Sequence, residues 1–253
     1  MENELVNIGI IIVVNLFAGF IGGQAGGAGL ISLPLLMVLG LNPVIALGTL
    51  RFSAIFLNAA SSIEYVKKKK VDLKKILPFL IVSMIGSVLG TYVTISIDEV
   101  LLKKIIAIVF LTLLVITLIN NKVGLKDKKF QLSTKQLILF TILTFVTGIY
   151  GGFIGVATPT FFALIFIFFG QSFTKGVGYG MVLATLLSLS STVVFILNGY
   201  VNFFYAIPLS ISLALGGWLG AKYGIKRGNL WVKYVFAVMI ALFIIKLFWE
   251  IYL

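Results

Sequence analysis

The sequence predicts an all-α integral membrane protein made of two inverted repeats. Each repeat is expected to hold a broken or re-entrant Gly-rich helical hairpin and three transmembrane helices. The first observation is composition: 60% of the 253 residues are hydrophobic and 11% are charged, whereas an average soluble domain is about 25% charged. The second is a pair of long uncharged runs with glycine-rich centres. The third is an internal repetition of the chain.

The first uncharged run extends from Leu5 to Leu41 and is 37 residues long. One membrane-crossing helix needs about 20 apolar residues, and each glycine in a helix interior costs roughly 1 kcal/mol relative to alanine. The six glycines in the centre of this run, between Gly19 and Gly29, therefore predict a break. In lipid, a break must be buried in protein or line a wet cavity. Close helix packing through small residues is the alternative, and both can hold.

A second uncharged run extends from Leu137 to Phe169 and is 33 residues long, with GIYGGFIGVATPTFFAL at its centre. Its glycines and Pro159 predict a second break. Interrupted hydrophobic segments at corresponding places in two halves of a chain indicate the binding site of a transporter.

The remaining apolar segments complete each half. In the first half, spans are expected at Val44–Val66, Ile76–Ile97 and Ile105–Ile119. The predicted organisation is one membrane domain with repeat 1 at 1–120, a cytoplasmic linker at 121–135 and repeat 2 at 136–253.

Internal duplication is supported by residue identities at a constant offset of 130. Six pairs share it: Gly40 and Gly170, Gly48 and Gly178, Val71 and Val201, Pro78 and Pro208, Gly86 and Gly216, Gly90 and Gly220. Within the Gly-rich runs the offset is 129. Such self-similarity is the sequence signature of a repeat architecture.

The charge distribution decides the orientation of the halves. If each Gly-rich run enters and returns, each repeat has an odd number of crossings and the halves are inverted. Sixteen basic loop residues then lie on one side and only Lys103 and Lys104 on the other. If each run crosses once, the split is eleven to seven. Because cytoplasmic loops carry excess Lys and Arg, the first layout is favoured, and both termini are expected outside.

Composition also excludes several functions. The chain has no cysteine and no histidine, and only eight carboxylates, so thiolate chemistry and the commonest general base and metal ligand are missing. No enzyme, metal or cofactor is therefore expected. The net charge of +12 is explained by the positive-inside rule, so no nucleic acid is expected. The basic loop from Lys67 to Lys75 is expected to contact membrane lipid.

Two motifs stand out in each half of the chain. In the first half these are AGGAGLISLP (Ala25–Pro34) and ALGT (Ala46–Thr49). In the second half they are GFIGVATPTFFAL (Gly152–Leu164) and NGYVN (Asn198–Asn202). Together they resemble the TauE/SafE family of sulfite exporters and organosulfur-anion permeases, of the TSUP superfamily. The resemblance covers almost the whole chain and implies anion transport.

Arg51 is the strongest single candidate for a substrate-binding residue. A cationic side chain within a span costs about 2.5–3.5 kcal/mol on insertion scales, and its guanidinium fork suits an oxyanion. Snorkelling to the interface is the alternative. Around it, backbone N–H groups at the Gly-rich breaks and neutral polar side chains are expected to bind the anion. The predicted substrate-binding residues are Gln24, Gly26, Gly27, Gly29, Arg51, Ser53, Asn58, Gly155, Thr158 and Thr160. For the polar side chains, helix–helix hydrogen bonding is the competing explanation.

The predicted function is secondary transport of a small anion, sulfite, sulfonate or similar, by alternating access between the two breaks. A passive anion channel is the alternative, and a membrane scaffold without transport is a third possibility. The expected location is the plasma or inner membrane, and the sequence does not define an oligomeric state.

Overall fold

The computed structural model describes residues 2–68, 70–98 and 132–228, together with 230, 231, 234 and 238. Every regular element in these residues is an α-helix, and six helices are long and apolar enough to cross a membrane. Their bounds are α1 (Glu2–Ala25), α2 (Gly29–Val38), α3 (Pro43–Lys67), α4 (Leu73–Ser96), α6 (Thr134–Phe153), α7 (Thr158–Phe168), α8 (Phe173–Leu197) and α9 (Phe203–Arg227). The chain is therefore a multi-pass membrane protein. The predicted span Ile105–Ile119, most of the linker at 121–135 and most of repeat 2 after Gly228 lie outside the described residues.

The helices follow the same order in both halves: a long helix, a short helix and two further long helices. α3 and α8 both contain 25 residues, and their first residues, Pro43 and Phe173, are 130 apart. The same offset separates Leu73, where α4 begins, from Phe203, where α9 begins. The two predicted breaks lie at the expected places, between α1 and α2 and between α6 and α7.

Local sequence explains where the central helices begin. The side chain of Asn42 accepts a hydrogen bond from Ile45 N at 2.9 Å, and Pro43 occupies the first turn of α3. Asn202 caps α9 in the same way, accepting from Tyr205 N at 3.2 Å. These are the residue types that satisfy the free N–H groups at a helix start.

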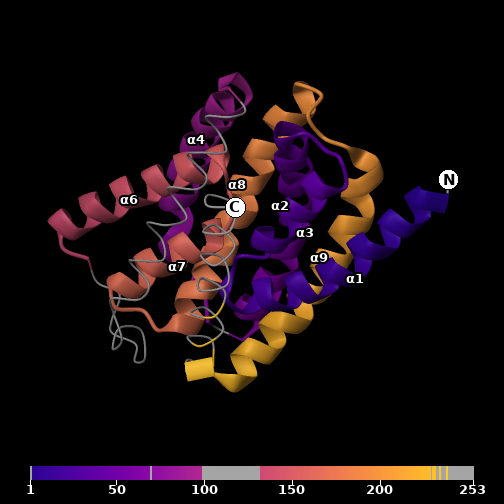
Figure 1. Cartoon of the computed structure of the whole chain (residues 1–253). Helices are drawn as coiled ribbons and strands as arrows, with labels where there is room; N and C mark the ends of the chain where they lie inside the picture. Colours follow the sequence, from indigo (N-terminus) through magenta and orange to yellow (C-terminus); the bar gives the residue numbers. More distant parts are fainter. Residues whose placement is uncertain are drawn as a thin grey trace.

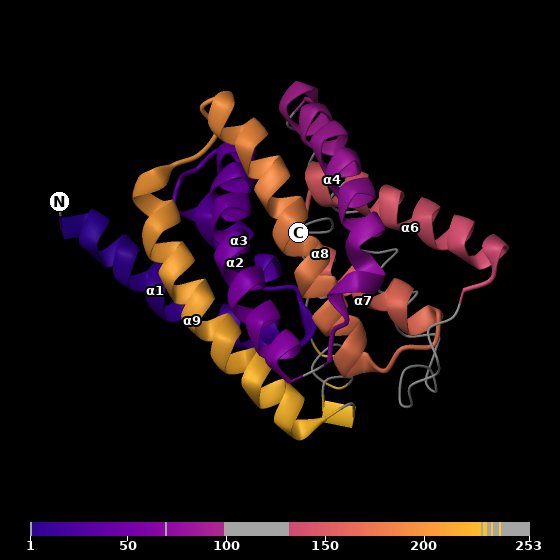
Figure 2. The same ribbon diagram turned by 180° about the vertical axis from the view of Figure 1, so that it is seen from behind.

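Each half packs its first long helix against the last described helix of the other half. α1 lies along α9, and α6 lies along α4 (Figures 1 and 2). Glycines permit the close approach: a Cβ on Gly23 would overlap the carbonyl of Gly217, and a Cβ on Gly90 would overlap that of Ile149. Part of the glycine content therefore serves helix packing, as small residues do in membranes.

α3 and α8 occupy the middle of the molecule and run in opposite directions (Figure 1). Ser62, near the end of α3, lies 3.5 Å from the hydroxyl of Thr185 in the middle of α8. At the other end, the hydroxyl of Thr49 accepts a hydrogen bond from the backbone of Asn202, just beyond α8, at 3.0 Å. Corresponding helices of the two halves thus cross the centre antiparallel.

α9, in contrast, runs parallel to α3. Ser53 donates to the carbonyl of Ala206 at 3.1 Å, and farther along both helices Trp218 Nε1 donates to Glu64 Oε1 at 2.9 Å. The equivalent pair, α4 and α8, is also parallel, through hydrogen bonds that join Ser87 to Leu187 and Thr91 to Ser191.

These directions bring most of the described basic residues to one end of the molecule. α3 and α9 end there, and α4, α6 and α8 begin there. This end carries Lys67, Lys68, Lys135, Lys175, Lys222, Lys226 and Arg227. The charge asymmetry expected from the sequence is therefore a property of the folded chain as well.

The short helix α2 turns back along α1. Ser32 Oγ donates to Asn15 Oδ1 at 2.5 Å, although a continuous helix would separate residues 17 positions apart by about 25 Å. The first Gly-rich run thus forms a helical hairpin.

Candidate functional site

The two helix breaks meet in the interior. Thr160, in the first turn of α7, donates from its hydroxyl to the carbonyl of Ala25 at 2.9 Å, and Ala25 is the last residue of α1. A Cβ on Gly26 would overlap the Thr160 hydroxyl. The break of the first half and that of the second half, about 130 positions apart in the chain, are therefore in direct contact.

Left-handed backbone conformations shape both breaks. Gly26 and Gly27 have φ values of 83° and 86°, and Gly155 has a φ of 70°. Ala157 also adopts the left-handed region, with a φ of 59°, which is uncommon for a residue with a side chain. Backbone strain of this kind persists where the surrounding structure enforces it, often at ligand sites.

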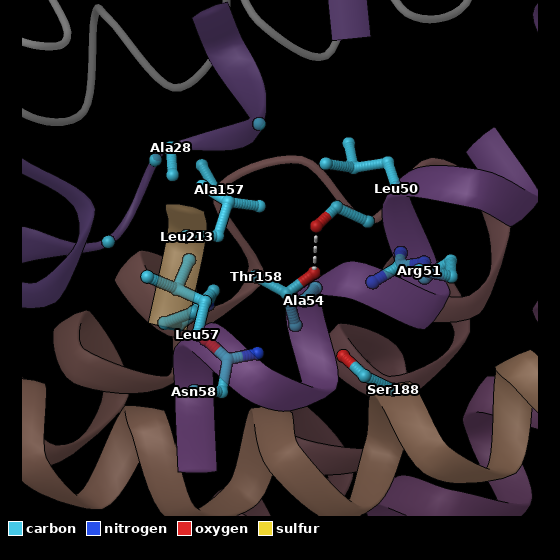
Figure 3. A pocket seen from close by; sticks show the side chains of 15 residues that line it. Ala28, Leu50, Arg51, Ala54, Leu57, Asn58, Ala157, Thr158, Ser188 and Leu213 are labelled. Carbon is cyan, nitrogen blue, oxygen red and sulfur yellow. Dashed lines mark hydrogen bonds between the residues drawn. The ribbon is translucent and has the colours of Figure 1, made fainter. Parts of the chain in front are cut away.

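The starts of α2 and α7 border a pocket between the breaks (Figure 3). The macrodipole places roughly half a positive charge at a helix start. In α7 the N–H groups of Thr158 and Thr160 donate to the carbonyls of Gly155 and Ala157 at 3.4 and 2.9 Å, and Pro159 has no N–H. The residues that line the pocket are Gly26, Gly27, Ala28, Gly29, Leu50, Arg51, Ala54, Leu57, Asn58, Gly155, Ala157, Thr158, Pro159, Ser188 and Leu213.

Among the described residues that line this pocket, Arg51 is the only charged one. Its side chain is 4% exposed, and its Nη2 atom is buried without a hydrogen-bond partner in the part of the chain that the structure describes. A Cβ on Gly155 would overlap the guanidinium, so the arginine of α3 reaches across to the break of the other half. The guanidinium thus lies inside the protein rather than at its surface, which disfavours the snorkelling alternative.

Asn58 and Ser188 supply neutral polar groups to the same pocket. Asn58 Oδ1 and Ser188 Oγ are both buried and have no hydrogen-bond partner among the described residues, and the side chains are 2% and 1% exposed. Buried polar atoms are nearly always hydrogen-bonded in native proteins. Three such atoms around one pocket, with Arg51 Nη2 as the third, are a set of groups that a polar ligand would satisfy.

Seven of the ten predicted site residues line the pocket: Gly26, Gly27, Gly29, Arg51, Asn58, Gly155 and Thr158. The other three contact neighbouring helices. Gln24 accepts from Trp231 Nε1 at 2.6 Å, Ser53 donates to Ala206 O at 3.1 Å, and Thr160 holds the two breaks together.

Ser188 is a lining residue that the sequence-based prediction omitted. Its position is 130 residues after Asn58, so the repeat offset applied to a predicted site residue would have identified it. Arg51 has Met181 at the same offset, and Met181 is fully buried and apolar. Among the described lining residues, charge is therefore supplied by the first half alone.

The surroundings of the polar groups are apolar. The pocket wall is completed by Leu50, Ala54, Leu57 and Leu213. Apolar side chains exclude water, and exclusion of water strengthens electrostatic interactions with a bound ion. Within the part of the chain that the structure describes, no group of three His, Cys, Asp or Glu residues could hold a metal ion.

The comparisons with known proteins agree with one another: one matches a family model and the others match membrane transporter proteins. The profile of the family described as Sulfite exporter TauE/SafE matches residues 11–247. A probable membrane transporter protein of Haemophilus influenzae is 30% identical over 233 residues, which cover 92% of this chain and 91% of the relative. The probable membrane transporter protein YfcA of Escherichia coli is 25% identical over 96% of this chain and 90% of its own length. YunE of Bacillus subtilis, also named a probable membrane transporter protein, is 25% identical over 95% of this chain and 97% of its own length. No solved structure matches the chain.

Proposed function

The chain belongs to the sulfite exporter TauE/SafE family, and we propose that it is a secondary transporter of small anions of the sulfite or organosulfonate type. The observation that carries this proposal is Arg51, which lines a pocket that the starts of two helices border and whose buried Nη2 atom has no hydrogen-bond partner among the described residues. A cation held in a dry site is stabilised by a counter-ion, and within the described lining residues no carboxylate supplies one. An anionic substrate would do so.

The proposed mechanism is alternating access between two inverted repeats, residues 1–120 and 136–253, joined by a cytoplasmic linker at 121–135. The antiparallel course of α3 and α8 supports inversion, and the hairpin of α1 and α2 supports a re-entrant first segment. Transporters of inverted-repeat architecture bind substrate near the membrane midplane, where half-helix N-termini face it. Rocking of one repeat against the other would expose the pocket to each side in turn, and transport requires no chemical step on the substrate.

We further propose that the basic end of the molecule faces the cytoplasm of a plasma or inner membrane. The gathering of Lys67, Lys175 and Lys222 at one end supports this orientation through the positive-inside rule. Both termini are then outside, and the basic loops lie against anionic lipid headgroups.

Flux measurements on purified protein in proteoliposomes test the proposal. Uptake of sulfite should saturate with concentration, and an internal load of unlabelled sulfite should accelerate uptake of labelled sulfite by counterflow. Flux that rises linearly without counterflow would instead indicate a channel. No protein-dependent flux of sulfite, thiosulfate or a simple sulfonate would contradict anion transport.

A further inference from the structure

The charge of the pocket can be assigned from its described lining residues. Arg51 contributes one formal positive charge. Its counterpart in the second half, Met181, is uncharged and is not among the residues that line the pocket. The described lining residues include no carboxylate. The buried carboxylate of Glu64 accepts a hydrogen bond from Trp218 and lies thirteen residues farther along α3, a rise of about 20 Å.

The helix starts add to this charge. α2 begins at Gly29 and α7 at Thr158, and both residues line the pocket. Each N-terminus acts as roughly half a positive charge within its first turn. With Arg51, whose buried Nη2 atom has no partner within the described part of the chain, the site therefore presents the equivalent of about two positive charges.

From this balance we propose that the site selects compact, doubly charged oxyanions over singly charged anions of the same shape. The inference rests on the proposed function and adds the charge class of its substrate. A dianion leaves the closed site near neutrality, whereas a monoanion leaves about one positive charge uncompensated in an apolar enclosure. Asn58 and Ser188 hydrogen-bond the anion without changing the charge.

The shape of the lining favours a compact anion with its charge on one centre. Leu50, Leu57 and Leu213 stand beside the polar groups, so a long polar substituent on the substrate would face side chains that cannot hydrogen-bond it. The recognised chemistry is a tetrahedral or pyramidal oxyanion head group. This head group occurs in inorganic anions and in organic sulfonates, which differ in charge.

Isothermal titration with sulfate and perchlorate isolates charge, because both anions are tetrahedral and carry four oxygens. We expect the purified wild-type protein to bind sulfate at least about tenfold more tightly than perchlorate at constant ionic strength. Perchlorate gives up its hydration water more readily, so a site without charge selectivity would show the reverse order. Methanesulfonate, with the sulfonate head group and a single charge, should bind weakly like perchlorate.

Two variants of Arg51 locate the origin of the selectivity. Arg51→Met installs the residue that the second half carries at the same position, and it should remove the preference for sulfate. Arg51→Lys keeps the charge without the guanidinium fork and should keep the preference at lower overall affinity.

The remaining outcomes contradict either the charge inference or the proposed function. Perchlorate or methanesulfonate binding as tightly as sulfate in the wild type would overturn the charge inference and leave an anion site standing. A sulfate preference that persists in Arg51→Met would also overturn it. If no anion binds and none crosses proteoliposomes, the proposed function fails as well.

Discussion

The guanidinium of Arg51 occupies the space that a side chain at Gly155 would fill. Arg51 belongs to α3 in the first half and Gly155 to the break before α7 in the second half. The absence of a side chain at one position thus determines where the charge of the other can lie. The contact joins the two halves at the pocket, and any relative movement of the halves would alter it.

The first prediction follows from this contact. Gly155→Ala should displace the guanidinium and weaken sulfite binding at least about tenfold, because a lost hydrogen bond to a charged group costs about 1.5–3 kcal/mol. Gly199→Ala is the matched control: Gly199 also has a positive φ, 73°, but a Cβ there meets no atom within 4 Å. Both variants carry the backbone strain, so equal affinities in isothermal titration would contradict the role assigned to Gly155.

The second prediction concerns glycines that serve packing. A Cβ on Gly90 would overlap the carbonyl of Ile149, so Gly90→Ala should force α4 and α6 apart and destabilise the protein by about 2–3 kcal/mol. Gly9→Ala, in a helix and in open space, should be neutral or gain up to about 1 kcal/mol from helix propensity. Thermal unfolding in detergent measures both, and a Gly90→Ala protein as stable as Gly9→Ala would refute the packing role.

The third prediction addresses orientation. The chain has no cysteine, so single cysteines can be introduced at the exposed Lys68 and Asn198. An impermeant maleimide applied to intact cells should label Asn198→Cys and should label Lys68→Cys only after the membrane is opened. The opposite pattern would place the basic end outside and contradict the positive-inside assignment.

The fourth prediction tests the neutral lining. Asn58→Asp places a carboxylate in the pocket, where it would neutralise Arg51 and repel an anion, so sulfite affinity should fall at least about tenfold. Asn58→Ser copies the residue that stands at the equivalent position, Ser188, and should lower affinity only about threefold. Similar affinities for the two variants would place Asn58 away from the bound anion.

Much of the fold and of the pocket is predictable from the sequence, because a membrane leaves few options for a broken helix. The glycines predicted both breaks, and the cost of burying a cation singled out Arg51. Helical geometry accounts for two further outcomes. Asn58, seven residues after Arg51, shares its helix face and lines the pocket, whereas Ser53, two residues after it, points elsewhere and bonds Ala206.

Other features depend on tertiary contacts that local sequence does not encode. The left-handed conformation of Ala157 is enforced by its surroundings against the intrinsic preference of alanine. Gln24 lies next to the first break, yet its side chain accepts a hydrogen bond from Trp231, 207 residues later in the chain. Adjacency in sequence to a break therefore does not specify the direction of a side chain.

Titration of sulfite into wild-type protein, Arg51→Lys and Arg51→Gln tests the central claim most directly. If Arg51 binds the substrate anion, Arg51→Gln should weaken affinity roughly ten- to a hundredfold, or about 1.5–3 kcal/mol. Arg51→Lys should be intermediate, because the charge remains and the bidentate fork is lost. Equal affinities for the three proteins would remove Arg51 from the site and contradict the account.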